Sequence, residues 1–169
     1  WAKSQMNGYN FHIQETKFAD FLIDTLKVEE EAIKRKNLQI ISEIPKEQII
    51  KTDYQVLQVI VRNFLSNAVK FTPLGGKISI SLEENNEFYH IGVTDTGRGM
   101  SPEEIKKVLI DQNRYSIKGT ENEPGNGIGL ILCQEIAEKI GGHIQVESTP
   151  GLGSTFIFIF PKYIHTDKV

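Results

Sequence analysis

Residues 95–100 read Asp-Thr-Gly-Arg-Gly-Met and follow a run, residues 88–94 (FYHIGVT), that alternates as a half-buried β-strand does. A carboxylate at the end of such a strand is costly to bury unless a hydrogen-bond donor satisfies it. Gly97 and Gly99 have no Cβ, so the backbone can adopt positive φ angles or let a flat ring approach closely. The segment therefore predicts the floor of a pocket, with the exocyclic amine of adenine as one candidate donor to Asp95.

The rest of the chain alternates between helical and strand-like periodicity around this strand. Apolar residues recur at helical spacing in the long stretches and alternate in the short ones, with turns rich in glycine, proline and asparagine between them. Two runs that flank the turn at residues 84–86 are typical of an antiparallel hairpin. We expect helices at residues 17–36, 54–71, 102–110 and 127–140, and strands at 38–44, 77–82, 87–95, 143–148 and 154–161. This order is typical of an α+β fold in two layers, with helices packed on one face of a mixed, mostly antiparallel sheet.

Two of the expected helices carry N-terminal capping signals. Thr52 and Asp53 precede the helix at residues 54–71, and Asp and Thr side chains accept hydrogen bonds from the first helical amides. Ser101 precedes Pro102, which is favoured at the first helical position because it lacks an amide hydrogen.

Length and composition bound the class of protein. The 169 residues suit one domain with a full-sized core, and 39% hydrophobic and 24% charged residues are ordinary for a globular protein. A net charge of −3 gives no reason to expect a nucleic-acid surface. The lone Cys133 excludes an intrachain disulfide and a thiolate metal cluster. The chain begins at Trp1 rather than Met, so we expect a fragment of a longer protein.

The helix expected at residues 54–71 presents polar side chains beside its apolar stripe. Asn63, Asn67 and Lys70 are spaced i, i+4 and i+7, so they share one edge of the helix next to the buried face. Such an edge is either the wall of a pocket or a solvated helix edge, and the helix alone does not decide between them. In a pocket, the amide oxygen of Asn67 would suit Mg²⁺, which takes few protein ligands, and Lys70 would reach a phosphate.

Residues 125–130 (GNGIGL) join an aperiodic stretch, residues 111–126, to the last helix. The amides and the positive dipole end of a helix N-terminus favour an anion, and glycines let a polyphosphate lie against the backbone. The spacing matches neither the dinucleotide-binding fingerprint nor a Walker loop, and a flexible helix entry is the alternative. Because so long an aperiodic stretch is usually functional, we expect a lid whose Arg114 and Lys118 contact phosphates.

Four segments together resemble the N, G1, G2 and final G boxes of one family: residues 63–72 (NFLSNAVKFT), 95–100, 125–130 and 151–156 (GLGSTF). These boxes mark the catalytic, ATP-binding domain of sensor histidine kinases, within the gyrase, Hsp90, histidine kinase and MutL superfamily. The resemblance covers residues 18–162. It implies the Bergerat α/β sandwich, ATP and Mg²⁺ as ligands, and transfer of the γ-phosphate to a histidine on a separate dimerising helical hairpin.

The resemblance also implies how the chain is divided and what it works with. Residues 1–14 would be the end of the dimerisation and phosphoacceptor hairpin with its linker, and residues 15–169 the catalytic domain with an ATP lid at about 111–126. The implied partners are the phosphoacceptor domain of the same parent protein and the receiver domain of a response regulator. We expect a monomeric fragment of a homodimeric parent, and a cytoplasmic domain whether or not the parent is anchored in a membrane.

The family's motifs assign roles to individual residues of this sequence. Asp95 would hold the adenine amine and face the carbonyl of guanine unfavourably, Asn67 would ligate Mg²⁺, and Thr155 would help to line the adenine end. The ATPase branches of the superfamily have a general-base Glu where this chain has Asn63, which favours transfer to a protein over hydrolysis. The predicted catalytic residues are Asn63, Asn67 and Lys70, and the predicted ATP-binding residues are Asn63, Asn67, Lys70, Asp95, Gly97, Gly99, Arg114, Lys118, Gly125, Gly127, Gly129, Leu130 and Thr155.

Three features depart from the family's pattern or are missing from the chain. Residues 108–115 lack the paired Phe of the F box, which bears on lid anchoring and on docking to the hairpin. Asn126 stands where Thr is more usual between the first two glycines. No histidine is followed by a phosphoacceptor sequence, so we expect ATP binding without self-phosphorylation; the histidines are His12, His90, His143 and His165.

Three other functions fit parts of the sequence. Asp-Thr-Gly is also the catalytic tripeptide of aspartic proteases, but that mechanism needs two carboxylates that share a proton, and the chain has no second copy. A non-catalytic, ATP-binding scaffold domain would explain the degenerate F box. A serine-directed kinase, as in the related anti-sigma-factor kinases, would keep the same ATP site.

Overall fold

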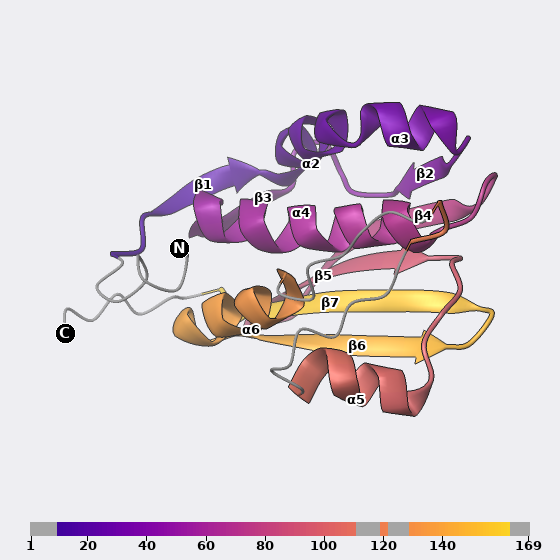
Figure 1. Ribbon diagram of the computed structural model, residues 1–169. Coiled ribbons are helices and arrows are strands. Elements are labelled where there is room, and N and C mark those ends of the chain that lie inside the picture. The colour runs from indigo at the N-terminus through magenta and orange to yellow at the C-terminus, as the bar shows by residue number, and fades with distance from the viewer. Residues whose placement is uncertain (1–9, 111–118, 122–128, 163–169) are drawn as a thin grey trace.

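The computed structural model describes residues 10–110, 119–121 and 129–162 (Figure 1). The predictions for residues 1–9, for most of the lid and for the start of the last helix lie outside the described residues. The elements in chain order are β1 (Ile13–Lys17), α2 (Phe18–Val28), α3 (Glu30–Arg35), β2 (Gln39–Ser42), β3 (Ile49–Asp53), α4 (Tyr54–Phe71), β4 (Lys77–Glu84), β5 (Phe88–Asp95), α5 (Pro102–Ile110), α6 (Gly129–Lys139), β6 (His143–Thr149) and β7 (Gly153–Pro161).

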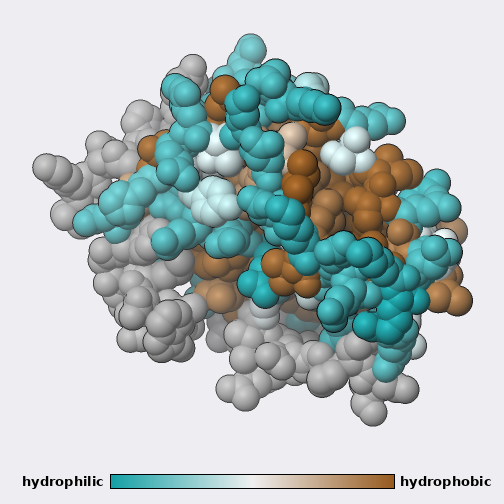
Figure 2. Space-filling view, turned by 90° about the horizontal axis from the view of Figure 1, so that it is seen from above, coloured by the Kyte–Doolittle hydropathy of each residue, from teal (hydrophilic) through white to brown (hydrophobic). Residues whose placement is uncertain are grey.

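The single helix predicted at residues 17–36 is wrong, because the chain breaks into α2 and α3 at Glu29. The amide of Glu29 donates to the carbonyl of Leu26, 3.0 Å away, and the helical ladder resumes when Ile33 N donates to Glu29 O. Position 29 continues the buried stripe of α2 at helical spacing, and an unpaired glutamate would be costly to bury there. On this side of the molecule, hydrophilic and hydrophobic side chains are mixed (Figure 2).

Strands β1 and β3 were not among the predicted elements. They pair antiparallel in a separate two-stranded sheet, from Ile13 opposite Asp53 to Lys17 opposite Ile49. β1 buries one of its five residues, Thr16, so its sequence does not show the alternation of a half-buried strand. β1 is therefore defined by a partner distant in sequence rather than by its own pattern.

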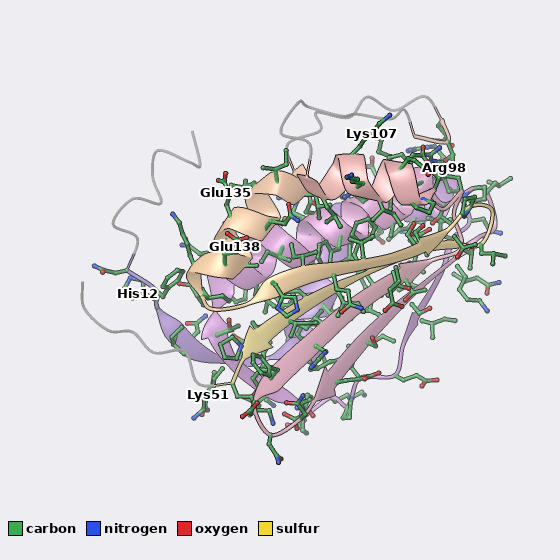
Figure 3. All side chains as sticks on the ribbon, turned by 90° about the horizontal axis from the view of Figure 1, so that it is seen from below. His12, Lys51, Arg98, Lys107, Glu135 and Glu138 are labelled. Atoms are coloured by element: carbon green, nitrogen blue, oxygen red, sulfur yellow. The ribbon has the colours of Figure 1, made fainter. Side chains whose placement is uncertain are left out.

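The larger sheet has five strands in the order β2-β4-β5-β7-β6. β2 is parallel to β4, and the other neighbours are antiparallel. Helices α4, α5 and α6 lie on the same side of this sheet (Figure 3). The predicted α+β fold, with a mixed, mostly antiparallel sheet and helices on one face, is confirmed.

Helix α4 spans the predicted residues and forms the centre of the core. Its buried Phe64 packs on Phe156 of β7, with ring centroids 5.5 Å apart. Asp53 caps the helix, because its Oδ1 accepts hydrogen bonds from Gln55 N at 2.8 Å and Val56 N at 3.2 Å. A cap of this kind contributes about 1 kcal/mol to stability.

Within the described residues the other predicted elements are confirmed, with small shifts at their ends. β4 and β5 form the predicted hairpin, and β6 and β7 pair antiparallel. At the start of α5, Ser101 Oγ accepts from Glu104 N at 3.2 Å, and Glu104 Oε2 accepts from Ser101 N at 2.9 Å. This reciprocal pair is a capping box. Within the described ranges, no helix is both long and apolar enough to cross a membrane.

Candidate functional site

Asp95 is the last residue of β5, and its side chain lies on the face of the sheet that the helices cover. The residue is 4% exposed, and its Oδ1 accepts a hydrogen bond from Gly97 N at 2.7 Å. Burial raises the pKa of Asp95, and backbone hydrogen bonds from Gly97 and Ser154 oppose the rise. None of these causes is a positively charged group, so among the described residues the carboxylate lies beside backbone donors rather than a cation.

Gly97 and Gly99 are required by close packing in the loop after Asp95. A Cβ at Gly97 would lie 2.5 Å from the carbonyl oxygen of Phe71, the last residue of α4. Gly99 has a φ of +65°, and a Cβ there would lie 1.9 Å from the carbonyl oxygen of Thr149. Arg98, between them, pairs with the start of α5 instead (Figure 3). The loop is thus packed between the C-terminal end of α4, at Gly97, and the end of β6 (His143–Thr149), at Gly99.

The polar edge of α4 carries the asparagine pair that its spacing predicts. Asn63 and Asn67 are both half-buried, and Asn67 Nδ2 donates to Asn63 Oδ1 at 3.2 Å. This bond uses the amide nitrogen of Asn67, so Asn67 Oδ1 is the atom of this side chain that can accept a hydrogen bond or bind a cation. One turn further along, Lys70 Nζ lies 4.9 Å from the ring centroid of Phe71. Along this edge, the amide oxygen of Asn67 is therefore followed by the ammonium of Lys70 towards the C-terminus of the helix.

The first described turn of helix α6 packs against this edge of α4. A Cβ at Gly129, the first described residue of the helix, would lie 2.1 Å from Asn63 Nδ2, so a larger residue would displace the amide. The next residue, Leu130, is buried in the core. Gly129 and Asn63 consequently meet at one place.

The strand register places Thr155, which is predicted at the adenine end, on the opposite face of the sheet from Asp95. Asp95 lies opposite Ser154 and Thr94 opposite Thr155, and successive strand residues point to opposite faces of a sheet. Thr155 Oγ1 is 3.0 Å from Thr94 Oγ1, on the face away from Asp95. Ser154, which is buried and shares the face of Asp95, is a candidate site residue that sequence reasoning missed. Counting alternate positions back from the apolar Phe156 would have found it.

Four predicted site residues lie outside the described part of the chain: Arg114, Lys118, Gly125 and Gly127. Their roles stay predictions. Of the degenerate F box, Val108 and Leu109 are half-buried against the core, and residues 111–115 are outside the description.

The donor chemistry of the described residues fits a magnesium ion held mainly by a ligand. Among residues 10–110, 119–121 and 129–162, no group of three or more His, Cys, Asp or Glu side chains could hold a metal ion. Mg²⁺ usually binds one or two protein oxygens and keeps waters and phosphate oxygens for its other positions. The amide oxygen of Asn67 is a donor of this kind.

The two-layer α+β fold and the site at the covered face of its sheet are those of the nucleotide-binding sandwich class. Residues 52–164 match the family described as "Histidine kinase-, DNA gyrase B-, and HSP90-like ATPase", and the chain belongs to this family.

Relatives of the chain include sensor kinases. It is 34% identical over 140 residues to the "Adaptive-response sensory kinase SasA" of Rippkaea orientalis, which covers 82% of this chain and 35% of that protein. It is 28% identical over 166 residues to the "Sensor histidine kinase WalK" of Bacillus subtilis, which covers 95% of this chain and 26% of that protein. The chain therefore spans about a third or less of the length of these curated relatives.

A solved structure with the same fold is the catalytic domain of histidine kinase ThkA. It superposes with a TM-score of 0.74 at 24% identity and covers 90% of this chain and 99% of that chain. At this identity the likeness shows the fold.

Proposed function

We propose that the chain binds Mg-ATP along the edge of α4 and donates the γ-phosphate to a histidine on a separate dimerising hairpin of its parent protein. It would then be the catalytic part of a protein-histidine kinase in a two-component system. The observation that carries the proposal is the buried Asp95 carboxylate, held by backbone amides at the C-terminal end of the helix that bears Asn63, Asn67 and Lys70. Family membership supports the nucleotide, and the sensor-kinase relatives support the transfer.

In this proposal Asp95 recognises the base. An ionised carboxylate accepts from the exocyclic amine of adenine and is repelled by the carbonyl that guanine presents at that position. Because burial raises the pKa of Asp95, the carboxyl takes up a proton at a higher pH than an exposed one. Recognition of adenine therefore weakens as the pH falls.

The phosphates would lie along α4 towards the start of α6. Asn67 Oδ1 would ligate Mg²⁺, and Lys70 would contact a phosphate oxygen as a point charge. Bound Mg²⁺ neutralises phosphate charge as the γ-phosphoryl leaves. Asn63 orients Asn67 through the 3.2 Å hydrogen bond between their amides, and it cannot act as a general base towards water. The predicted contacts of Gly125, Gly127, Arg114 and Lys118 complete the proposal.

The proposal extends to the division of the chain and to its partners. Residues 1–14 would end the dimerisation hairpin and linker, residues 15–169 would form the catalytic domain, and residues 111–126 would form the ATP lid. The parent would be a homodimer, and a response regulator would receive the phosphate. One of the related solved structures is described as histidine kinase ThkA in complex with response regulator protein TrrA, which supports a partner of this class.

Phosphate transfer is tested by mixing the chain with the phosphoacceptor hairpin of its parent and γ-labelled Mg-ATP. We expect label on the hairpin that is lost in acid and stable in base, as for phosphohistidine. The Asp95→Asn variant serves as the control and is expected to leave the hairpin unlabelled. Label that survives acid and is lost in base would indicate serine phosphorylation and contradict the proposal.

A second candidate function is a non-catalytic ATP-binding scaffold. The observation that favours it is the F box, because residues 108–115 lack the paired Phe. A scaffold would bind Mg-ATP with the same selectivity for adenine and transfer no label to the hairpin. The transfer experiment therefore separates the two functions, provided that binding is measured on the same preparation.

A further inference from the structure

Lys36 is a fully buried lysine in a part of the chain to which the site motifs assign no role. It is the C-cap residue of α3, and it is 1% exposed. Lysine is almost never buried to this degree unless its charge is paired, because removing an ammonium from water is costly. The groups that surround its Nζ atom therefore decide what it does.

The Lys36 ammonium is bonded to two carbonyls at the end of α4. Its Nζ donates to Val69 O at 2.9 Å and to Lys70 O at 3.0 Å. The last carbonyls of a helix lack partners within the helix and carry the negative end of its dipole. A buried cation at this position donates hydrogen bonds to the unpaired carbonyls and offsets the negative end of the helix dipole.

The third donor of Lys36 reaches a different part of the chain. Nζ donates to Thr120 Oγ1 at 2.8 Å, across 84 positions of sequence. Thr120 N in turn donates to Lys70 O at 3.1 Å, and Thr120 Oγ1 also lies 3.1 Å from Lys70 O. The neighbouring residues are paired as well, because Arg35 Nε lies 3.2 Å from Glu121 Oε2.

The main-chain carbonyl of Lys70 is thus the common acceptor for Lys36 and Thr120. We propose that Lys36 is a positioning residue for nucleotide binding: its buried ammonium joins Thr120 to the C-terminal end of α4 and so fixes the backbone of Lys70 at the phosphate end of the site. This inference rests on the proposed function, since it requires that Lys70 contacts phosphate. Lys36 itself is buried beneath the helix end and does not touch the nucleotide.

The test compares Lys36→Met, Thr120→Val and the double variant, with Lys34→Met as the matched control. Thr120 is exposed, so the nearly isosteric Thr120→Val change removes the hydroxyl that accepts from Lys36 and donates to Lys70 O, with little effect on folding. Lys34 lies in α3, two residues before Lys36, and pairs with Glu30 at the surface. The measurements are calorimetric titration with Mg-ATP and Mg-ADP and the thermal midpoint of each variant.

We expect Lys36→Met and Thr120→Val each to lower the affinity for Mg-ATP by roughly three- to tenfold, the range of one lost hydrogen bond. The double variant should be no weaker than the weaker single variant, because both changes break the same link. Lys34→Met should bind as the wild type does. A purely structural role would lower the thermal midpoint of Lys36→Met and leave Thr120→Val unchanged in affinity.

Two results overturn the inference, and they differ from failure of the proposed function. Unchanged Mg-ATP affinity in Thr120→Val, with normal binding by the wild type, would show that the link does not position the site. Fully multiplicative losses in the double variant would show that Lys36 and Thr120 act separately. If Lys36→Met does not fold, Thr120→Val alone decides. Absence of binding by the folded wild type would overturn the proposed function, and this inference with it.

Discussion

The two ends of helix α4 are built in different ways. At the N-terminal end, one side chain next to the helix in sequence satisfies the first amides, since Asp53 Oδ1 accepts from Gln55 N and Val56 N. The other oxygen of Asp53 accepts from His12 N at 2.8 Å, which attaches the start of β1. At this end of α4, one side chain both caps the first amides of the helix and binds the backbone of the neighbouring strand segment.

At the C-terminal end, the groups around the helix come from distant parts of the chain. Lys36 donates to two carbonyls, and Thr120 N donates to the carbonyl of Lys70. Gly97 packs so closely that a Cβ there would lie 2.5 Å from the carbonyl oxygen of Phe71. The candidate site residues lie along this half of the helix. A locally capped end contributes stability, whereas an end assembled from several segments can place unlike groups around a ligand. The two ends should therefore respond differently to mutation.

The largest expected effect is at the assembled end, from Asp95→Asn. The amide presents a donor as well as an acceptor and loses the charge, so we expect Mg-ADP affinity to fall at least about 100-fold. The unfolding free energy should change by no more than about 1–2 kcal/mol. Titration calorimetry and urea unfolding measure the two quantities. Unaltered affinity in a folded Asp95→Asn protein would refute the site assignment.

Gly129→Ala should lower Mg-ATP affinity by about tenfold, because small displacements of positioning groups have large effects. The added Cβ would lie 2.1 Å from Asn63 Nδ2 and force that amide to move. Alanine is the better helix former, so stability should be unchanged or slightly higher. The same titration, together with the amide resonances of Asn63 and Asn67, checks this. Unshifted resonances with unchanged affinity would contradict the close packing of α6 on α4.

The affinity for Mg-ADP should fall as the pH is lowered through the raised pKa of Asp95, because the protonated carboxyl cannot accept as an anion. The pH affects the stability of the unliganded protein through Asp95 in the opposite direction. Its folded pKa lies above its unfolded value, so its favourable contribution is present at low pH and is lost as the pH rises through the folded pKa. Asp95→Asn should flatten the pH dependence of both quantities. Equal slopes in the two proteins would contradict this assignment.

Substitutions at two adjacent residues of β7 should differ by a few-fold in their effect on nucleotide affinity. Ser154→Ala should weaken adenine-nucleotide binding by about threefold, since Ser154 shares the face of Asp95. Thr155→Val should leave binding unchanged, because Thr155 lies on the other face beside Thr94. Titration of the two variants side by side provides the comparison. The reverse order of effects would show that the register is wrong.

The smallest expected effect on binding is at the capped end. Asp53→Ala should lower the unfolding free energy by about 1–2 kcal/mol, the upper range for loss of an N-cap, and leave the affinity for Mg-ATP as in the wild type. Urea unfolding and titration on one preparation measure both. A loss of affinity comparable to that of Gly129→Ala would mean that the two ends of α4 are not independent.

The sequence predicted those helices and strands whose hydrophobic periodicity and capping residues lie within the element itself. The stripe of α4 and its Asp53 cap lie within a few residues of each other, so the helix could be assigned with its ends. The hairpin of β4 and β5 was likewise visible from alternation and its turn. The break at Glu29 was missed because one charged residue on a buried stripe leaves the periodicity otherwise intact.

Features that depend on partners distant in sequence could not be predicted. β1 and β3 pair although α2, α3 and β2 lie between them in sequence, and Lys36 donates to Thr120, which is 84 positions further along the chain. Thr155 was predicted at the adenine end because a motif gives composition and not the face of a strand. The asparagine pair was predicted from helical spacing, whereas its contact with Gly129 required the packing of α6.

The most direct test of the central claim is calorimetric titration of the wild-type chain with Mg-ATP, Mg-ADP and Mg-GTP. We predict saturable binding of both adenine nucleotides and no binding of Mg-GTP at the same concentrations, because Asp95 accepts from adenine and faces the guanine carbonyl unfavourably. Equal binding of Mg-GTP, or no binding by a protein shown to be folded, would contradict the account.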